Sequence, residues 1–264
     1  MPIGPARMPL MDHFGELRMR IVRIIVTLIV CILVFYVAAP TIGQFMLLPI
    51  KDFLPQDENG MQLFALTPFE SFGTRFKIAF WSSVVASSPM ILWQLLAFFL
   101  PALKPKERKW FVPTFVAAVV LFILGVVFCY AVILKTAIQW LVDQSQGLGD
   151  VIPQMSAYID IIIKFEIGFG IAFQLPLIVF YLVVFGIIPY KKLRSSWRII
   201  YVVLLVFCAV ITPDASPVTM LLLFVALVLL YEISLLFSRV VLARKIAKEK
   251  EEERELIGDE DEDD

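Results

Sequence analysis

Long apolar runs separated by short clusters of lysine and arginine are the feature that most constrains this chain. The 264 residues are 60% hydrophobic and the mean hydropathy is +0.86, whereas a soluble domain is roughly half apolar. One core in a chain of this length cannot bury such an excess, so we expect lipid to cover it. The sequence therefore predicts an all-α polytopic membrane protein.

Six apolar stretches are long enough, or nearly so, to cross a membrane as helices. A helix needs about 20 apolar residues to cross about 30 Å of hydrocarbon. The fifth stretch offers only about 15, so it and the short sixth one must thin the bilayer or rely on protein neighbours. We expect the first, second and fourth helices to stop at Pro40, Pro101 and Pro189. The predicted spans of this transmembrane domain (residues 1–245) are about 21–39, 76–100, 111–134, 158–188, 197–211 and 217–237.

The basic residues are distributed unevenly around these stretches. Of the 23 lysines and arginines, 18 fall in residues 1–25, 101–110 and 189–198 or from Arg239 onward. Because basic residues collect in cytoplasmic loops, we predict these segments and both termini to be cytoplasmic. The long outer loops, 40–75 and 135–157, are expected to form short helices on the surface or packed as a cap. Residues 246–264 are strongly acidic and are expected to form a disordered cytoplasmic tail.

The sequence lacks the motifs that would indicate an enzyme or a cofactor site. The nucleotide-binding pattern GxxxxGK[ST], the metalloprotease pattern HExxH and the hydrolase pattern GxSxG are all absent. The one histidine lies in the N-terminal leader, and the three cysteines lie in apolar runs without metal-ligand spacing. We predict no catalytic residue, no metal, no cofactor and no nucleic-acid partner.

Two polar residues lie deep in the fourth apolar stretch. Ionisable groups cost about 2.5–3.5 kcal/mol at the centre of a membrane helix, so Glu166 and Gln174 are candidate functional residues. Eight residues apart, they fall on one broad helix stripe, and Pro176 is expected to kink the helix. Alternatively, Glu166 lies near the outer interface and Gln174 bonds a neighbouring helix. Asp160 and Lys164 are expected to form an ion pair, being four residues apart.

Two acids, Glu16 and Glu107, lie inside the cytoplasmic basic clusters, where a topology signal does not need them. Carboxylates in such positions suit a basic ligand, because guanidinium–carboxylate pairs are strong and directional. A rival interpretation is an ion- or proton-coupled secondary transporter, with Glu166, Asp160 and Lys164 as a relay. The lack of an internal repeat weighs against a carrier, and a carrier needs neither Glu16 nor Glu107. A scaffold without cargo is a third option.

Three stretches of the chain resemble TatC, the multispanning subunit of the twin-arginine protein translocase. Residues 12–20 read DHFGELRMR and resemble the family's HLxELRxR signature, with phenylalanine in place of the usual leucine. Residues 98–109 read FFLPALKPKERK and resemble its FxxPAL…ER loop. Residues 158–176 resemble its FGxxFExP segment, and six spans with both ends inside also match. The resemblance covers about residues 8–245.

The resemblance implies a receptor for folded precursors that carry twin-arginine signal peptides. Transport would cross the bacterial cytoplasmic (inner) membrane and draw on the proton-motive force. Glu16 and Glu107 would form the docking surface for the arginine pair. Arg18 matches the leader arginine of the family, and Phe98 matches its loop phenylalanine. TatA-type and TatB-type single-span proteins would be partners, and the chain would form a homo-oligomer within the complex.

Two departures from the family pattern concern the membrane interior. Gln174 stands where the family has glutamate, and Glu166 would replace that glutamate from nearby. The family's TPPDxxSQ pattern is only partly matched after the fifth span, where Thr212 fits and Thr219 is the nearest polar substitute for the glutamine. We expect both threonines to contact a partner's helix. The apolar residues expected to pack against that helix are Val203, Leu204, Leu222 and Leu223.

Overall fold

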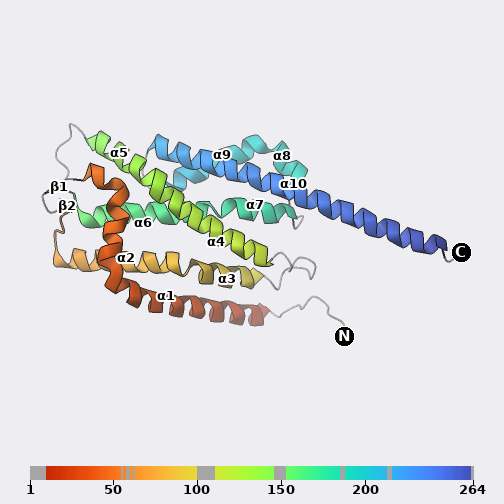
Figure 1. Ribbon diagram of the computed structural model, residues 1–264, viewed down its shortest axis with the longest axis horizontal. Coiled ribbons are helices and arrows are strands. Elements are labelled where there is room, and N and C mark those ends of the chain that lie inside the picture. Colours follow the sequence, from red (N-terminus) through yellow and green to blue (C-terminus); the bar gives the residue numbers. More distant parts are fainter. Residues whose placement is uncertain are drawn as a thin grey trace.

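The computed structural model describes residues 10–54, 56–57, 60–61, 63–99, 111–145, 153–184, 188–212 and 216–262, of which 10–13, 56–57, 60–61, 99, 184, 191 and 241–262 are described by their backbone alone. Most of these residues form helices that lie side by side along one axis (Figure 1). In that view α1 begins and α10 ends on the right, while η1 and the strands lie on the left. The all-helical membrane fold predicted from the sequence is confirmed.

The first helix, α1 (Leu10–Leu47), continues past Pro40 and leads directly into a 3-10 helix, η1 (Leu48–Phe53). The prediction that this helix stops at Pro40 is therefore wrong. Pro40 has no N–H for the carbonyl of Tyr36, four residues earlier, and Arg75 donates its Nε–H to that oxygen instead, at 3.1 Å. The helix bends at this point, and its last turns cross the bundle in Figure 1.

The second and third apolar stretches form interrupted helices longer than predicted. α2 (Pro68–Ala86) and α3 (Ser88–Phe99) meet at a bend of 57°. Ser83 and Ser87 each bond a carbonyl one turn earlier, and Pro89 lacks an N–H, so the helix is weakened there. α4 (Phe111–Phe128) continues through a π-helical turn, η4 (Cys129–Ile133), into α5 (Leu134–Ser145).

The fourth stretch is interrupted ahead of Pro176, where the sequence predicted a kink. α6 (Met155–Ala172) and α7 (Leu175–Val184) are separated at Phe173 and Gln174, because Pro176 has no N–H for the carbonyl of Ala172. The chain then forms α8 (Tyr190–Ser195), α9 (Trp197–Ile211) and α10 (Pro217–Glu262).

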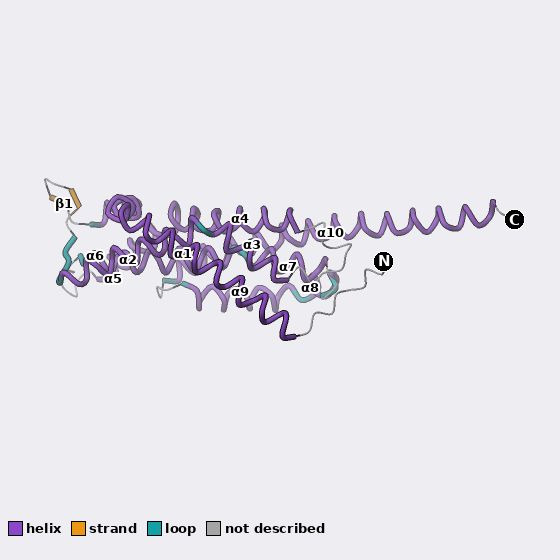
Figure 2. Tube along the Cα trace, turned by 90° about the horizontal axis from the view of Figure 1, so that it is seen from below, coloured by secondary structure: helices purple, strands orange, loops and turns teal. Residues whose placement is uncertain are grey.

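The backbone of α10 stays helical to Glu262, whereas the sequence predicted a disordered tail from residue 246. Glutamate and lysine are good helix formers, and in this segment they often stand three or four residues apart, which supports a helix locally. Figure 2 shows α10 extending well beyond the other helices.

The two long outer loops are joined to each other by hydrogen bonds. The Phe64 N–H donates to the Pro153 carbonyl at 2.9 Å, and the Met155 N–H donates to the Phe64 carbonyl at 3.0 Å. The Tyr130 hydroxyl donates to the Phe45 carbonyl at 2.7 Å, and the rings of Tyr130 and Phe45 stack at 5.0 Å. The first loop contains two short antiparallel strands of two residues each, β1 (Gln56–Asp57) and β2 (Gly60–Met61). Together with η1 and α5, these segments cap one end of the bundle.

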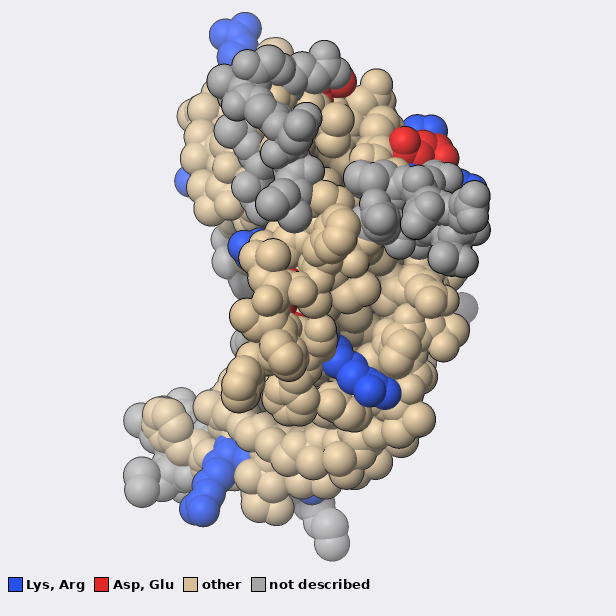
Figure 3. Space-filling view, turned by 90° about the vertical axis from the view of Figure 1, so that its left-hand side faces the viewer, with Lys and Arg blue, Asp and Glu red and all other residues tan. Residues whose placement is uncertain are grey.

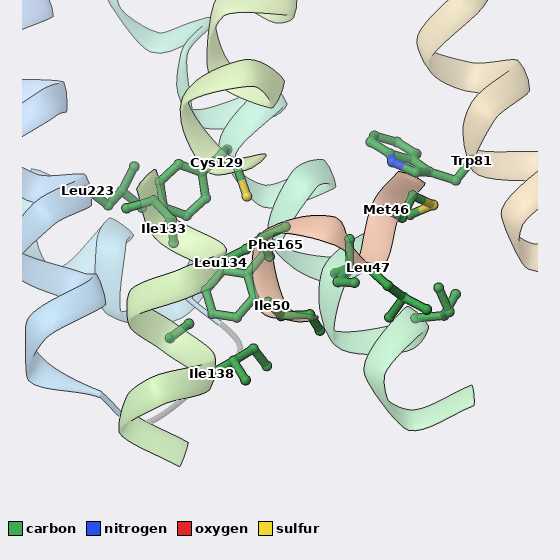
Figure 4. Packing of buried hydrophobic residues seen from close by; sticks show 14 of the residues in the cluster. Met46, Leu47, Ile50, Trp81, Cys129, Ile133, Leu134, Ile138, Phe165 and Leu223 are labelled. Carbon is green, nitrogen blue, oxygen red and sulfur yellow. The ribbon is translucent and has the colours of Figure 1, made fainter. Parts of the chain in front are cut away.

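The core is centred on α6, which packs against α1, α2, α4 and α9. Phe165 and Phe169 of α6 are fully buried. Gly125 lets α4 approach closely, since a Cβ there would lie 2.7 Å from the Phe169 carbonyl oxygen. Figure 4 shows Met46 of α1 beside Trp81 of α2 in the same buried cluster. Side chains distant in sequence therefore share one interior.

The outside of the bundle is apolar, as a lipid environment requires. Val37 is 76% exposed and Val210 is 78% exposed. Figure 3 views the left end of Figure 1 and shows a few scattered charges on an otherwise uncharged surface, with a hollow on one side of the outline. Within the described ranges, four helical stretches are long and apolar enough to cross a membrane, or five if the bent α2–α3 pair counts as one span. α9 is a shorter apolar helix, so the six-span topology stays a prediction.

Candidate functional site

A carboxylate near the start of α1 is held by a neighbouring arginine. Arg20 donates to Glu16 Oε1 through Nε, at 3.1 Å, and through a terminal nitrogen. The other terminal nitrogen of Arg20 donates to Gln94 Oε1 of α3, at 3.1 Å. This chain of contacts links α1 to α3 at the end of the bundle where α1 begins, on the right of Figure 1.

One oxygen of the Glu16 carboxylate has no hydrogen-bond partner among the described residues. The Glu16 side chain is 26% exposed, and this oxygen, Oε2, is enclosed. An ionised carboxylate accepts hydrogen bonds on both oxygens, and a second guanidinium is a strong donor for the one left over. A basic ligand at the start of α1 would have to displace the groups that enclose Oε2 to bind it.

The structure brings two further predicted residues to the same end. Phe98 is half-buried and follows Gln94 by four residues on α3, so the two lie on one face of that helix. Arg18 is exposed on α1, two residues after Glu16. The fourth predicted residue, Glu107, lies outside the described residues.

Arg20 and Gln94 were not singled out from the sequence. Arg20 could have been found, because it stands four residues after Glu16 on an expected helix. Gln94 is the one amide side chain within the apolar stretch of α3, but nothing local connects it to the leader.

The two intramembrane candidates have different neighbours. Glu166 is only 5% exposed, and its Oε2 accepts a hydrogen bond from the indole Nε1–H of Trp81 on α2. It therefore lies in the interior of the protein. Gln174 donates its amide to the Ala118 carbonyl of α4, at 3.0 Å. Although they share a sequence stripe, the two side chains contact different helices.

The expected ion pair between Asp160 and Lys164 is wrong. Asp160 binds Lys77 of α2, whose Nζ lies 2.7 and 2.8 Å from the two carboxylate oxygens. Lys164 is exposed. The tertiary contact with α2 replaces the local i,i+4 pair, so the proposed relay is not assembled from these residues.

Both predicted partner-contact threonines are turned inward. Thr212 is 7% exposed and its hydroxyl donates to the Cys208 carbonyl at 3.0 Å. Thr219 is fully buried and its hydroxyl donates to the Ser216 carbonyl at 3.1 Å. Leu204 and Leu223 are also buried, at 8% and 0% exposure. The part of the expected packing surface that these two leucines would form is therefore core, contrary to the sequence-based expectation.

A polar cluster on α10 was missed by the sequence analysis. Arg194 of α8 pairs with Glu232 at 2.9 Å, and the Tyr201 hydroxyl of α9 donates to Glu232 at 2.9 Å. Glu232 is the one acidic residue in the apolar part of α10, which was the available signal. Among the described residues no group of three or more metal-ligating side chains is present.

Comparison with known proteins assigns the chain to a family. The family model described as "Sec-independent protein translocase protein (TatC)" matches residues 12–225. The chain belongs to the TatC family. TatC from Deinococcus radiodurans is 32% identical over 94% of this chain and 91% of its own length. TatC from Aquifex aeolicus is 30% identical over 90% of this chain and 98% of its own.

Solved TatC structures agree with the bundle described above. The match to the crystal structure of the twin-arginine translocase receptor TatC in DDM covers 86% of this chain and 99% of the TatC chain. The sequence identity is 29% and the TM-score is 0.70. A second TatC receptor structure gives the same TM-score at 30% identity. Membership in TatC makes this chain a protein translocase component and not an enzyme, in agreement with the motif analysis.

Proposed function

We propose that this protein is the twin-arginine translocase subunit that binds the signal peptides of folded precursors. The observation that carries the proposal is the carboxylate of Glu16, which is held by Arg20 on one oxygen and has no hydrogen-bond partner among the described residues on the other. The similar solved structures, which are described as twin-arginine translocase receptors, support the same role.

In this proposal the signal peptide supplies the missing donor. One arginine of the pair binds Glu16 Oε2, and the other binds Glu107 in the neighbouring loop. Arg20 keeps the Glu16 carboxylate in place through Oε1, and Arg18 adds to the positive charge that anchors this end in the cytoplasm. Phe98, half-buried on α3, offers an apolar contact to the signal's hydrophobic segment.

The remaining parts of the proposal concern the assembly. The subunit lies in the bacterial inner membrane with both termini in the cytoplasm, because 18 of its 23 basic residues fall in the segments assigned to that side. It works with TatA-type and TatB-type single-span proteins and with further copies of itself, and the assembled complex draws on the proton-motive force. A secondary transporter is not favoured, because Asp160 pairs with Lys77 and Glu166 with Trp81.

The test is binding of a twin-arginine peptide to the purified subunit. We expect Glu16→Gln to weaken binding about tenfold, or about 1.4 kcal/mol, because the guanidinium loses its charged acceptor. Glu107→Gln should have a similar effect, and a twin-lysine peptide should bind the parent poorly, since lysine cannot form the forked contact. Isothermal titration or fluorescence anisotropy in detergent gives the affinities.

Glu70→Gln is the matched control for these variants. Glu70 is an acid at the opposite end of the bundle, where it accepts hydrogen bonds from Ser156 and the Leu66 N–H. Its substitution should leave peptide affinity unchanged. Equal affinity of the parent and the Glu16→Gln, Glu107→Gln double variant for the twin-arginine peptide would show that the site lies elsewhere.

A further inference from the structure

At the bend in α1, a backbone carbonyl that lacks its helical hydrogen-bond donor accepts a hydrogen bond from an arginine. Because Pro40 has no N–H, the Tyr36 carbonyl accepts from Arg75 Nε at 3.1 Å. The guanidinium carbon of Arg75 also lies 4.8 Å from the centre of the Tyr36 ring. Both contacts are with uncharged groups, so they fix the position of the guanidinium without neutralising it.

No carboxylate among the described residues forms an ion pair with Arg75. Glu70 on α2 and Asp160 on α6 are engaged elsewhere: Glu70 with Ser156 and Asp160 with Lys77. The hydrogen bond to Tyr36 uses only Nε, which leaves the two terminal nitrogens for a ligand. A half-buried guanidinium beside apolar helices is costly without a counter-charge, so an anionic ligand would stabilise this site.

A cavity of about 230 Å³ opens beside this arginine, between α1, α2 and α6. Ala39 and Leu47 of α1, Ile78 of α2 and Ile159 of α6 form much of its wall. An apolar protein cavity of about 150 Å³ already holds a benzene molecule. The volume here is therefore enough for a segment of hydrocarbon chain.

The wall of the cavity also contains an unsatisfied hydroxyl. Thr74 is 2% exposed, and its Oγ1 has no hydrogen-bond partner among the described residues. Buried hydroxyls are nearly always bonded. Because Oγ1 is enclosed, a ligand would reach it only after the Thr74 side chain turns toward the cavity.

The surroundings of the cavity indicate that its ligand comes from the membrane. Phe72, one turn before Arg75, is 60% exposed and packs edge-on against Tyr36 with ring centres 6.3 Å apart. Val37, on the adjoining turn of α1, is 76% exposed. In a bilayer such side chains face lipid, and aromatic residues favour the interface where headgroups lie.

We propose that the cavity at the α1 bend binds one anionic phospholipid. Its phosphate lies against the terminal nitrogens of Arg75, for which a guanidinium fork is well suited. Part of one acyl chain occupies the space bounded by Leu47, Ile78 and Ile159. The site is independent of the proposed peptide site, which lies at the other end of α1.

Native mass spectrometry of the detergent-purified protein tests the site, using phosphatidylglycerol or phosphatidylcholine added at equal concentration. The parent should retain one phosphatidylglycerol in preference to phosphatidylcholine. Arg75→Gln should lower that retention about fivefold, the effect of one basic residue near anionic lipid. Arg75→Lys keeps the charge and should retain more than half of the binding. Ser71→Phe, at an exposed position on the cavity wall, should also displace the lipid.

Lys135→Gln is the matched control, because it removes an exposed positive charge from the same end of the bundle. It should leave retention unchanged, and size-exclusion profiles should show all variants folded. Equal retention by the parent, Arg75→Gln and Ser71→Phe overturns the proposal, as does equal binding of the two lipids by the parent. If Arg75→Gln loses a co-purifying protein while lipid retention stays constant, Arg75 serves a protein carboxylate and the lipid assignment is wrong.

Discussion

Glu166 and Trp81 form a polar contact in the interior that joins α6 to α2. The indole of Trp81 is the one hydrogen-bond donor to Glu166 found among the described residues, and both side chains are buried, at 5% and 4% exposure. We expect Trp81→Phe to destabilise the protein by about 1–3 kcal/mol, because it leaves a buried acceptor unsatisfied. Glu166→Gln keeps an acceptor for the indole and should cost less.

Thermal unfolding of the two variants in the same detergent measures this difference. A Trp81→Phe variant as stable as the parent would mean that Glu166 finds another donor.

The contact between Glu166 and Trp81 also marks a limit of what can be predicted from the sequence at the scale of single residues. A polar residue deep in an apolar stretch is visible in the sequence, but its partner lies 85 residues away and depends on how α2 and α6 pack. The pairing of Asp160 with Lys77 was missed for the same reason.

The close approach of α4 and α6 depends on Gly125. A Cβ at this position would lie 2.7 Å from the Phe169 carbonyl oxygen and 3.0 Å from Phe173 Cβ, and backbone atoms cannot move aside cheaply. We expect Gly125→Ala to lower stability by about 1–3 kcal/mol through overpacking. Gly73→Ala on α2 is the control, because nothing lies within 4 Å of a Cβ there. It should be neutral or stabilising by up to about 1 kcal/mol, since alanine favours a helix.

Melting temperatures and purification yields in detergent distinguish the two glycine variants. If Gly125→Ala is as stable as Gly73→Ala, α4 and α6 are not in tight contact in solution.

Prolines show what the sequence can and cannot predict about the helices. The interruption before Pro176 lies where a kink was predicted, because a missing N–H weakens a helix wherever it occurs. At Pro40 the same argument failed, because Arg75 from another helix bonds the freed carbonyl and the helix continues with a bend.

The charge distribution predicts the orientation of the whole molecule in the membrane. We expect cysteine introduced by Ser145→Cys, at the end of α5, to react with an impermeant thiol reagent added to intact cells. Cysteine introduced by Ser195→Cys, at the end of α8 beside a basic cluster, should stay unlabelled until the cells are opened. The natural cysteines, one partly buried and two buried, are replaced first. Labelling of the Ser195→Cys variant in intact cells would show that the topology is the reverse of the predicted one.

The packing of the whole molecule decides which faces of α9 and α10 a partner helix can contact. The apolar repeat of α9 and α10 was visible in the sequence, but which side of each helix faces inward was not. Leu204 and Leu223 are core, whereas Val206 on α9 is 58% exposed and Val225 and Leu229 on α10 are 54% and 59% exposed. A partner helix that packs on α9 and α10 would meet this second set, and polar contacts between membrane helices add only about 0.6 kcal/mol each.

We predict that Val206→Trp breaks partner co-purification and leaves twin-arginine peptide binding intact, because it adds bulk to the exposed face alone. Thr212→Val should keep the partner, since the Thr212 hydroxyl is buried and donates to the Cys208 carbonyl of its own helix. Val120→Trp, at a 56% exposed position of α4, controls for added bulk on another helix. Co-purification of a tagged single-span partner measures occupancy. If Val206→Trp keeps full occupancy while Val120→Trp loses it, the partner packs on α4 and the short α9 helix is covered by lipid or by another copy of the chain.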